Sequence, residues 1–115
     1  MAITAENLAE KYGITREMAD EYGFRSQTAW ATAHAEGYYK NEIVPVTLPD
    51  GSEFAVDEHP RRTSSLEKLA TLPLLNAFDE GATTTAGNAS GLNDAAAALV
   101  LTSREFAQTH GLTPL

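Results

Sequence analysis

The chain has 115 residues and no cysteine, which is enough length for one domain and excludes disulfides, thiolate metal sites and a cysteine nucleophile within the chain. Its 16 acidic against 8 basic side chains give a formal net charge of −8, which argues against nucleic acid as the main partner. No apolar run is long enough for a membrane helix and the first residues lack the pattern of a secretory signal, so we expect a cytoplasmic protein with no membrane partner.

The first third of the chain is predicted to form two helices. Thr4 is expected to cap a short helix over residues 4–12, which Gly13 ends in a left-handed cap. Thr15 is then expected to cap a second helix that ends near Gly37. Small or apolar residues recur three or four positions apart in this helix and predict its packing face: Met18, Tyr22, Ser26, Ala29 and Ala33.

The middle of the chain changes to a pattern of short extended runs. Residues 43–48 and 52–56 are rich in β-forming residues and are separated by Pro-Asp-Gly at 49–51, which predicts a hairpin. Further along, Ser64 and Glu67 have the spacing of a capping box. They predict a short helix over residues 65–72.

The last third combines a loop, an apolar run and a final helix. Residues 79–94 are small and turn-forming, which predicts a loop. The uniformly apolar run 95–101 is compatible with helix by its alanines, but its short length favours a strand buried on both faces. Thr102 and Glu105 then predict a capped helix that Gly111 ends, so we expect a strand followed by a helix at the C-terminal end.

Catalytic motifs are scarce. No pair among His34, His59 and His110 has the spacing of metal ligands on a helix, and no carboxylates cluster around them, so metal binding is not expected. The serines and threonines match no nucleophile-elbow pattern, and the glycine-rich loop lacks a phosphate-binding lysine.

Two local features point toward ligand binding. Arg61 and Arg62 form either a surface pair neutralised by the acidic residues before them or a basic site for a phosphorylated ligand. The glycines of the loop around Asn88 and Ser90 would let a ligand approach the backbone, where these side chains offer hydrogen bonds. The alternative is a structural turn that leads into a buried strand.

The same loop carries a family resemblance. Residues 85–101, TAGNASGLNDAAAALVL, closely resemble a segment of thiolases that usually reads TAGNASGLNDGAAA. Four further blocks are similar to this family in order and spacing: TAENLAEKYGITREMADEYGFRSQ, KNEIVPV, DEHPRR followed by SLEKLATL, and SREFAQTHGLTPL. The resemblance covers essentially the whole chain. It departs from the family at Ala82 and Ala95 and in the longer stretch PLLNAF.

The resemblance implies a fold class and a reaction. The fold class is α/β, mixed α+β in this chain, with residues 1–84 in the thiolase loop domain. Residues 85–115 would supply the loop that contacts coenzyme A, a core strand and a helix of the N-terminal half. Thiolases catalyse Claisen condensation or thiolysis of 3-ketoacyl-CoA, with a nucleophilic cysteine, a histidine and a second cysteine. The first of these should lie upstream of Met1 and the other two downstream of Leu115, so we expect the isolated chain to be inactive.

The resemblance also implies contacts with coenzyme A. Ser90 matches a serine that hydrogen-bonds the pantetheine arm, Ala86 a small residue that lines its tunnel, and Arg61 an arginine near the adenine and phosphate end. Phe78 matches a phenylalanine beside this pocket, and Met1 a methionine that contacts the substrate. The coenzyme A thioester is then a substrate, and no separate cofactor is expected.

The implied partners are the remaining thiolase halves, and the full enzyme is expected to be a homo-oligomer. The alternative to a part of a thiolase is a non-catalytic truncated remnant or a weak CoA-binding module.

Overall fold

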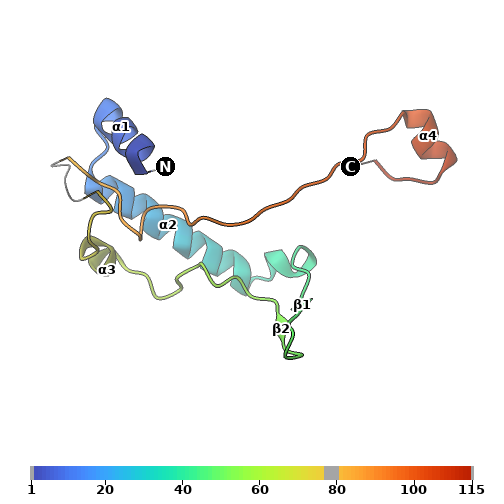
Figure 1. The fold of residues 1–115 in the computed structure, drawn as a ribbon, viewed down its shortest axis with the longest axis horizontal. Coiled ribbons are helices and arrows are strands. Elements are labelled where there is room, and N and C mark those ends of the chain that lie inside the picture. The colour runs from blue at the N-terminus through green and yellow to red at the C-terminus, as the bar shows by residue number, and fades with distance from the viewer. Residues whose placement is uncertain (1, 77–80, 115) are drawn as a thin grey trace.

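The computed structural model describes residues 2–76 and 81–114. Its elements follow in the order α1 (Ala2–Tyr12), α2 (Arg16–Ala35), the 3-10 helix η1 (Tyr38–Asn41), β1 (Val46–Thr47), β2 (Glu53–Phe54), α3 (Leu66–Ala70) and α4 (Arg104–Thr109). The helices α1, α2 and α3 lie together, whereas α4 lies far from them at the end of a long extended segment (Figure 1). The radius of gyration is 20.0 Å, against roughly 13 Å for a compact domain of this length. The molecule is therefore elongated.

The ends of the first two helices follow from local sequence. Gly13 has a φ of +64° and ends α1, as predicted. Thr15 caps α2, because its hydroxyl oxygen accepts a hydrogen bond from the Met18 amide at 3.3 Å, and Gly37, with a φ of +78°, follows its last turn. The prediction of a cap at Thr4 is wrong, since this residue lies inside α1.

The predicted packing face of α2 is also wrong. Met18 and Tyr22 are 53% and 66% exposed. The protected side of the helix carries Asp20, which is 4% exposed, and packs against α3 and the loop before residue 90. These neighbours present the carbonyls of Leu69 and Leu72 and the side-chain amide of Asn88 to α2, so polar side chains, rather than an apolar stripe, complete the packing.

The predicted hairpin is confirmed, with shorter strands. Antiparallel β1 and β2 pair Val46 with Phe54 and Thr47 with Glu53. Gly51 in the turn between them has a φ of +83°, a conformation that favours glycine. The hairpin projects from the end of α2 distant from α1 (Figure 1).

The third helix begins one residue later than predicted. Ser65, and not Ser64, caps α3, and its hydroxyl oxygen accepts a hydrogen bond from the Lys68 amide at 3.3 Å. Leu69 in this helix is 4% exposed. It lies against the loop that contains Gly87.

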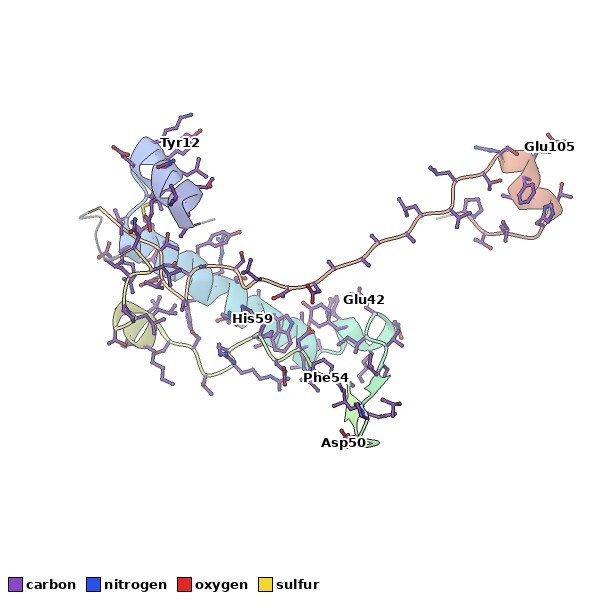
Figure 2. All side chains as sticks on the ribbon, in the orientation of Figure 1. Tyr12, Glu42, Asp50, Phe54, His59 and Glu105 are labelled. Atoms are coloured by element: carbon purple, nitrogen blue, oxygen red, sulfur yellow. The ribbon has the colours of Figure 1, made fainter. Side chains whose placement is uncertain are left out.

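The predicted strand over residues 95–101 is absent from the structure. These residues form no regular element, and Leu99, Val100 and Leu101 are 81%, 91% and 93% exposed. Side chains along the extended segment that leads to α4 stand apart from the rest of the chain (Figure 2). A strand needs a neighbouring strand to pair its backbone groups, and the described chain places none beside this run.

The last helix is short and starts later than predicted. Ser103, rather than Thr102, caps α4, and its hydroxyl oxygen accepts a hydrogen bond from the Phe106 amide at 3.1 Å. Gly111 follows the helix with a φ of +64°, as expected. Within the part of the chain that the structure describes, no helix has the length and apolarity needed to cross a membrane.

Candidate functional site

The loop before residue 90 is anchored to α1 by a buried carboxylate. Glu6 is 7% exposed. One of its oxygens accepts hydrogen bonds from the Thr83 amide at 2.9 Å and the Thr83 hydroxyl at 3.2 Å, and the other accepts from the Thr84 amide at 3.0 Å. A single side chain of α1 thus satisfies two consecutive backbone donors of the loop.

These hydrogen bonds change the acidity of Glu6. Burial raises its pKa, but the bonds from Thr84 and Thr83 outweigh burial and hold the pKa below the ordinary value of 4.5. The carboxylate is therefore ionised at neutral pH. In that form both of its oxygens are acceptors only, which matches the donors that surround them.

The Asn88 side chain forms hydrogen bonds within its own loop. Its side-chain oxygen accepts a hydrogen bond from the Thr85 amide at 2.8 Å. Its side-chain nitrogen donates to the Thr83 carbonyl at 2.9 Å and to Asp20 at 2.9 Å. Both amide hydrogens are therefore used within the chain. The expectation that Asn88 offers them to a ligand is wrong, because the loop needs them for its own shape.

A charged pair on α2 connects this loop to α3. Arg16 donates to the Asp20 carboxylate at 2.7 Å, in a pair with side chains 21% and 6% exposed. The same guanidinium donates to the Leu69 carbonyl at 2.6 Å and to the Leu72 carbonyl at 3.2 Å, at the end of α3. The loop, α2 and α3 are thus joined through two neighbouring polar side chains.

Two glycines allow the close approach of these segments. A Cβ atom on Gly87 would overlap the side chains of Leu69 and Leu72. A Cβ atom on Gly91 would overlap the ring of His59. The absence of a side chain at both positions lets the loop lie this close to α3 and to the segment before Arg61.

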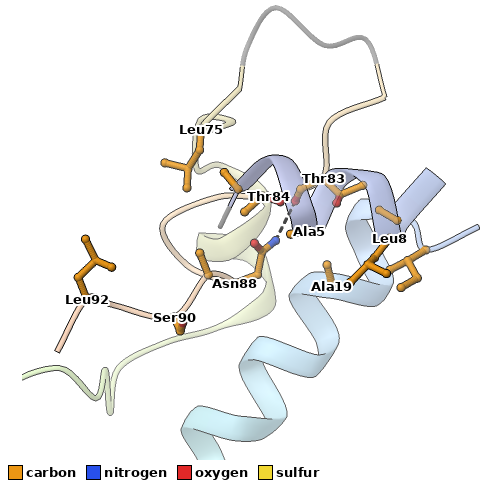
Figure 3. A pocket seen from close by; sticks show the side chains of 13 residues that line it. Ala5, Leu8, Ala19, Leu75, Thr83, Thr84, Asn88, Ser90 and Leu92 are labelled. Carbon is orange, nitrogen blue, oxygen red and sulfur yellow. Dashed lines mark hydrogen bonds between the residues drawn. The ribbon is translucent and has the colours of Figure 1, made fainter. Parts of the chain in front are cut away.

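A cavity of about 570 Å³ opens beside the loop. Small and apolar side chains of α1 and α2, such as Ala5, Leu8 and Ala19, line it together with Asn88 and Ser90 (Figure 3). A mostly apolar cavity with a few polar groups on one side is the usual character of a small-molecule site.

The structure places three of the five residues that the family resemblance singled out. Ser90 is exposed and lines the cavity. Ala86 is exposed and lies on the same loop, outside the cavity lining. Arg61 is exposed on the segment next to His59, which Gly91 contacts. Met1 and Phe78 lie outside the described residues.

The two adjacent arginines have different surroundings. The guanidinium of Arg62 lies 5.3 Å from the ring centroid of Trp30 and 3.2 Å from one ring nitrogen of His34, so this side chain covers the end of α2. Arg61 donates from its guanidinium to the Glu58 carbonyl oxygen at 3.1 Å, and its amide donates to the Gln27 side chain at 2.7 Å. Among the described residues, neither arginine forms an ion pair with the acidic side chains before it.

Sequence patterns did not reveal the anchoring residues Glu6 and Asp20. Acidic residues on helices are usually solvated, and nothing in their spacing marks these two as buried. The one available signal was the run of threonines at 83–85, whose backbone donors need acceptors wherever the loop is buried. No group of three or more His, Cys, Asp or Glu side chains suited to a metal ion occurs in residues 2–76 and 81–114.

Comparison with known proteins gives consistent matches. The family model for the N-terminal domain of thiolase matches residues 1–105. Acetyl-CoA acetyltransferase of Syntrophomonas wolfei is 48% identical over 120 residues, a match that covers 100% of this chain and 29% of that protein.

Solved structures agree with the sequence matches. The crystal structure of human mitochondrial 3-ketoacyl-CoA thiolase in complex with CoA aligns with a TM-score of 0.83 and 39% identity, over 99% of this chain and 28% of that chain. The Bacillus anthracis acetyl-CoA acetyltransferase aligns with a TM-score of 0.84 and 50% identity, over 97% of this chain and 29% of that chain. The chain therefore spans less than a third of the length of these relatives.

Proposed function

Because the chain belongs to the thiolase family, we propose that it is part of a thiolase, an acyltransferase that forms or cleaves 3-ketoacyl-CoA, and that it supplies one wall of the CoA pocket. The observation that carries this proposal is the position of Ser90, at the edge of an apolar cavity and at the end of a loop held by buried polar groups. A relative with 39% identity is a thiolase in complex with CoA, which supports CoA as the ligand.

In this proposal each residue has a chemical role. The Ser90 hydroxyl hydrogen-bonds an amide of the pantetheine arm, and Ala86 leaves room for that arm to pass. Arg61, whose side chain is exposed and anchored to the Glu58 carbonyl, binds a phosphate at the other end of CoA. The contact between Gly91 and His59 brings the segments that carry Ser90 and Arg61 side by side, as one extended ligand requires.

The chain alone has no group for the acyl-transfer step of this family. Thiolase chemistry uses cysteines, and the chain has none. The proposal assigns the nucleophile and the acid/base groups to the remaining halves of a complete enzyme. We expect the purified chain to show no thiolysis of acetoacetyl-CoA when consumption of that thioester is followed in the presence of CoA. Turnover that persists through stringent purification would contradict this division of roles.

The binding role is tested by calorimetry with CoA and with pantetheine. We expect weak binding of both ligands to the wild-type chain. Arg61→Ala should weaken CoA binding about tenfold and leave pantetheine binding unchanged, because a guanidinium–phosphate bond is lost. Ser90→Ala should weaken the binding of both ligands by a few fold.

Matched controls are available at positions that do not line the cavity. Arg104→Ala on α4 and Ser26→Ala on α2 remove the same groups at exposed positions and should change neither affinity. Equal CoA affinity for wild type and Arg61→Ala would refute the role of this arginine. Equal pantetheine affinity for wild type and Ser90→Ala would refute the role of the serine.

The alternative function is a non-catalytic remnant or a weak CoA-binding module, which the lack of cysteine favours. The coding sequence on both sides distinguishes the two. A cysteine-bearing half upstream and a histidine- and cysteine-bearing half downstream would favour the enzyme, whereas stop codons on both sides would favour the alternative.

A further inference from the structure

Side chains satisfy three consecutive amides of the loop before Ser90, while the Thr84 carbonyl accepts from the Leu75 amide at 2.9 Å beside an isolated bridge between Leu74 and Thr85. Residues 81–92 form no helix and join no regular strand. The amides of Thr83, Thr84 and Thr85 nevertheless each donate to a side-chain oxygen, two to Glu6 and one to Asn88. The path of these three residues therefore depends on Glu6 and Asn88 as well as on the backbone of Leu74 and Leu75.

The contacts of Glu6 extend toward Ser90 through one further residue. Glu6 fixes Thr83, the Thr83 carbonyl accepts from Asn88 at 2.9 Å, and Asn88 precedes Ser90 by two positions. Asp20 holds the same Asn88 amide from α2, also at 2.9 Å. The loop is therefore clamped between a carboxylate of α1 and a carboxylate of α2.

We propose that Glu6 is a positioning residue for coenzyme A binding, which sets the place of Ser90 by fixing the amides of Thr83 and Thr84. The inference rests on the proposed function, in which Ser90 contacts the pantetheine arm. Glu6 itself touches no ligand in this arrangement. It acts by keeping the loop in the shape that presents the serine hydroxyl to the cavity.

The ionised form of Glu6 is required for this role. Two carboxylate oxygens face three donors from Thr83 and Thr84, and a protonated oxygen would turn a hydrogen toward one of them. All described partners of the carboxylate are neutral. The charged groups of the same network, Asp20 and Arg16 on α2, lie on the other side of Asn88.

The pH dependence follows from the lowered pKa of Glu6. Its contribution to loop order is complete above the ordinary value of 4.5 and is lost as the pH falls through the lower folded-state pKa. Acid should therefore release the amides of Thr83 and Thr84. A residue with a purely packing role would give no such pH profile.

The test combines hydrogen exchange with ligand binding in the full 115-residue chain. Amide exchange at Thr83 and Thr84, corrected for intrinsic rates, is measured for wild type, Glu6→Gln and the control Glu10→Gln. Pantetheine affinity is measured for the same three proteins at neutral pH. Glu10 is the control because it is an exposed carboxylate on the same helix.

We expect Glu6→Gln to speed exchange at both amides about tenfold and to weaken pantetheine binding by a similar factor. The reason is that the NH₂ group of the new glutamine side chain must face a donor of Thr83 or Thr84. Acid below 4.5 should speed the same amides in wild type and Glu10→Gln, with no further increase in Glu6→Gln. If Glu6→Gln does not fold, two other measurements test the inference. One is amide exchange in Thr83→Val, which removes only the hydrogen bond from the Thr83 hydroxyl, and the other is the pH dependence of exchange in wild type.

The outcomes separate this inference from the proposed function. Equal exchange in wild type and Glu6→Gln overturns the inference whether or not coenzyme A binds. Faster exchange with unchanged pantetheine affinity also overturns it, because the loop would then move without consequence for the site. If Glu6→Gln exchanges faster but the wild-type chain binds no CoA, the proposed function is overturned and Glu6 remains an anchor of the loop.

Discussion

At the scale of single residues, the loop depends on side chains whose importance is invisible in the sequence. Glu6 and Asp20 lie in helical segments in which a carboxylate is normally solvated, yet they are 7% and 4% exposed. Their burial is tolerated because, among the described residues, every buried side-chain oxygen or nitrogen has a hydrogen-bond partner. Asn88, by contrast, was recognisable as a special residue, but its partners lie within the chain. The residue type predicted a polar side chain, but it could not show whether a ligand or the chain itself would take its hydrogen bonds.

Gly87 offers a test of how closely this loop must approach α3. We expect Gly87→Ala to lower the free energy of unfolding by about 1–3 kcal/mol, because a methyl group there would overlap Leu69 and Leu72. Urea denaturation of wild type and variant measures the difference.

A second substitution serves as the control for Gly87→Ala. If overlap is the cause, Leu72→Val should restore part of the loss when it is combined with Gly87→Ala, so the two effects will not be additive. Strict additivity in this double-mutant cycle would show that the cost comes from the backbone and not from the contact.

At the scale of elements, helix ends were more predictable than helix faces. Gly13, Thr15 and Gly111 were assigned correctly because caps depend on residues next to one another along the chain. The packing face of α2 was not, since it depends on carbonyl groups of α3 and on the Asn88 side chain of the loop, which no periodicity in α2 reveals. The division of the chain after residue 84 stays a prediction.

The segment 95–101 shows the same limit for strands. Its apolar sequence favours a strand buried on both faces, and the structure leaves it without regular pairing and exposed. A strand is a property of two chain segments, whereas its apolar pattern is a property of one. The resemblance assigned Ser90 and Arg61 to the candidate site through local motifs, and their contacts with coenzyme A stay a prediction. The resemblance gave no indication that the carboxylates of Glu6 and Asp20 hold the loop that carries Ser90.

At the scale of the whole molecule, little apolar surface is buried. The apolar side chains buried in the described part of the chain are Ala9, Leu69 and Ala107. Large apolar side chains such as Leu92 and Val100 are about nine-tenths exposed, at 90% and 91%. Exposed apolar surface on this scale favours association.

We therefore expect the isolated chain to self-associate in a concentration-dependent way, or to be only marginally stable. Val100→Asp should reduce the association, because it places a charge in the exposed apolar run. Val44→Asp is the matched control, since Val44 is also highly exposed, at 80%, but lies before the hairpin. Sedimentation velocity over a range of concentrations measures both variants. A monomeric wild type with a cooperative unfolding transition would contradict this expectation.

The hydrogen bonds between Glu6 and Thr83 also have a consequence for the order of folding. They join residues 77 positions apart, and the bond from Asn88 to Asp20 spans 68. Closing loops of this length costs entropy before any contact compensates it. The helices and the hairpin, whose hydrogen bonds are local, can form first. The loop that presents Ser90 should be the last part of the chain to become ordered and the first to be lost on unfolding.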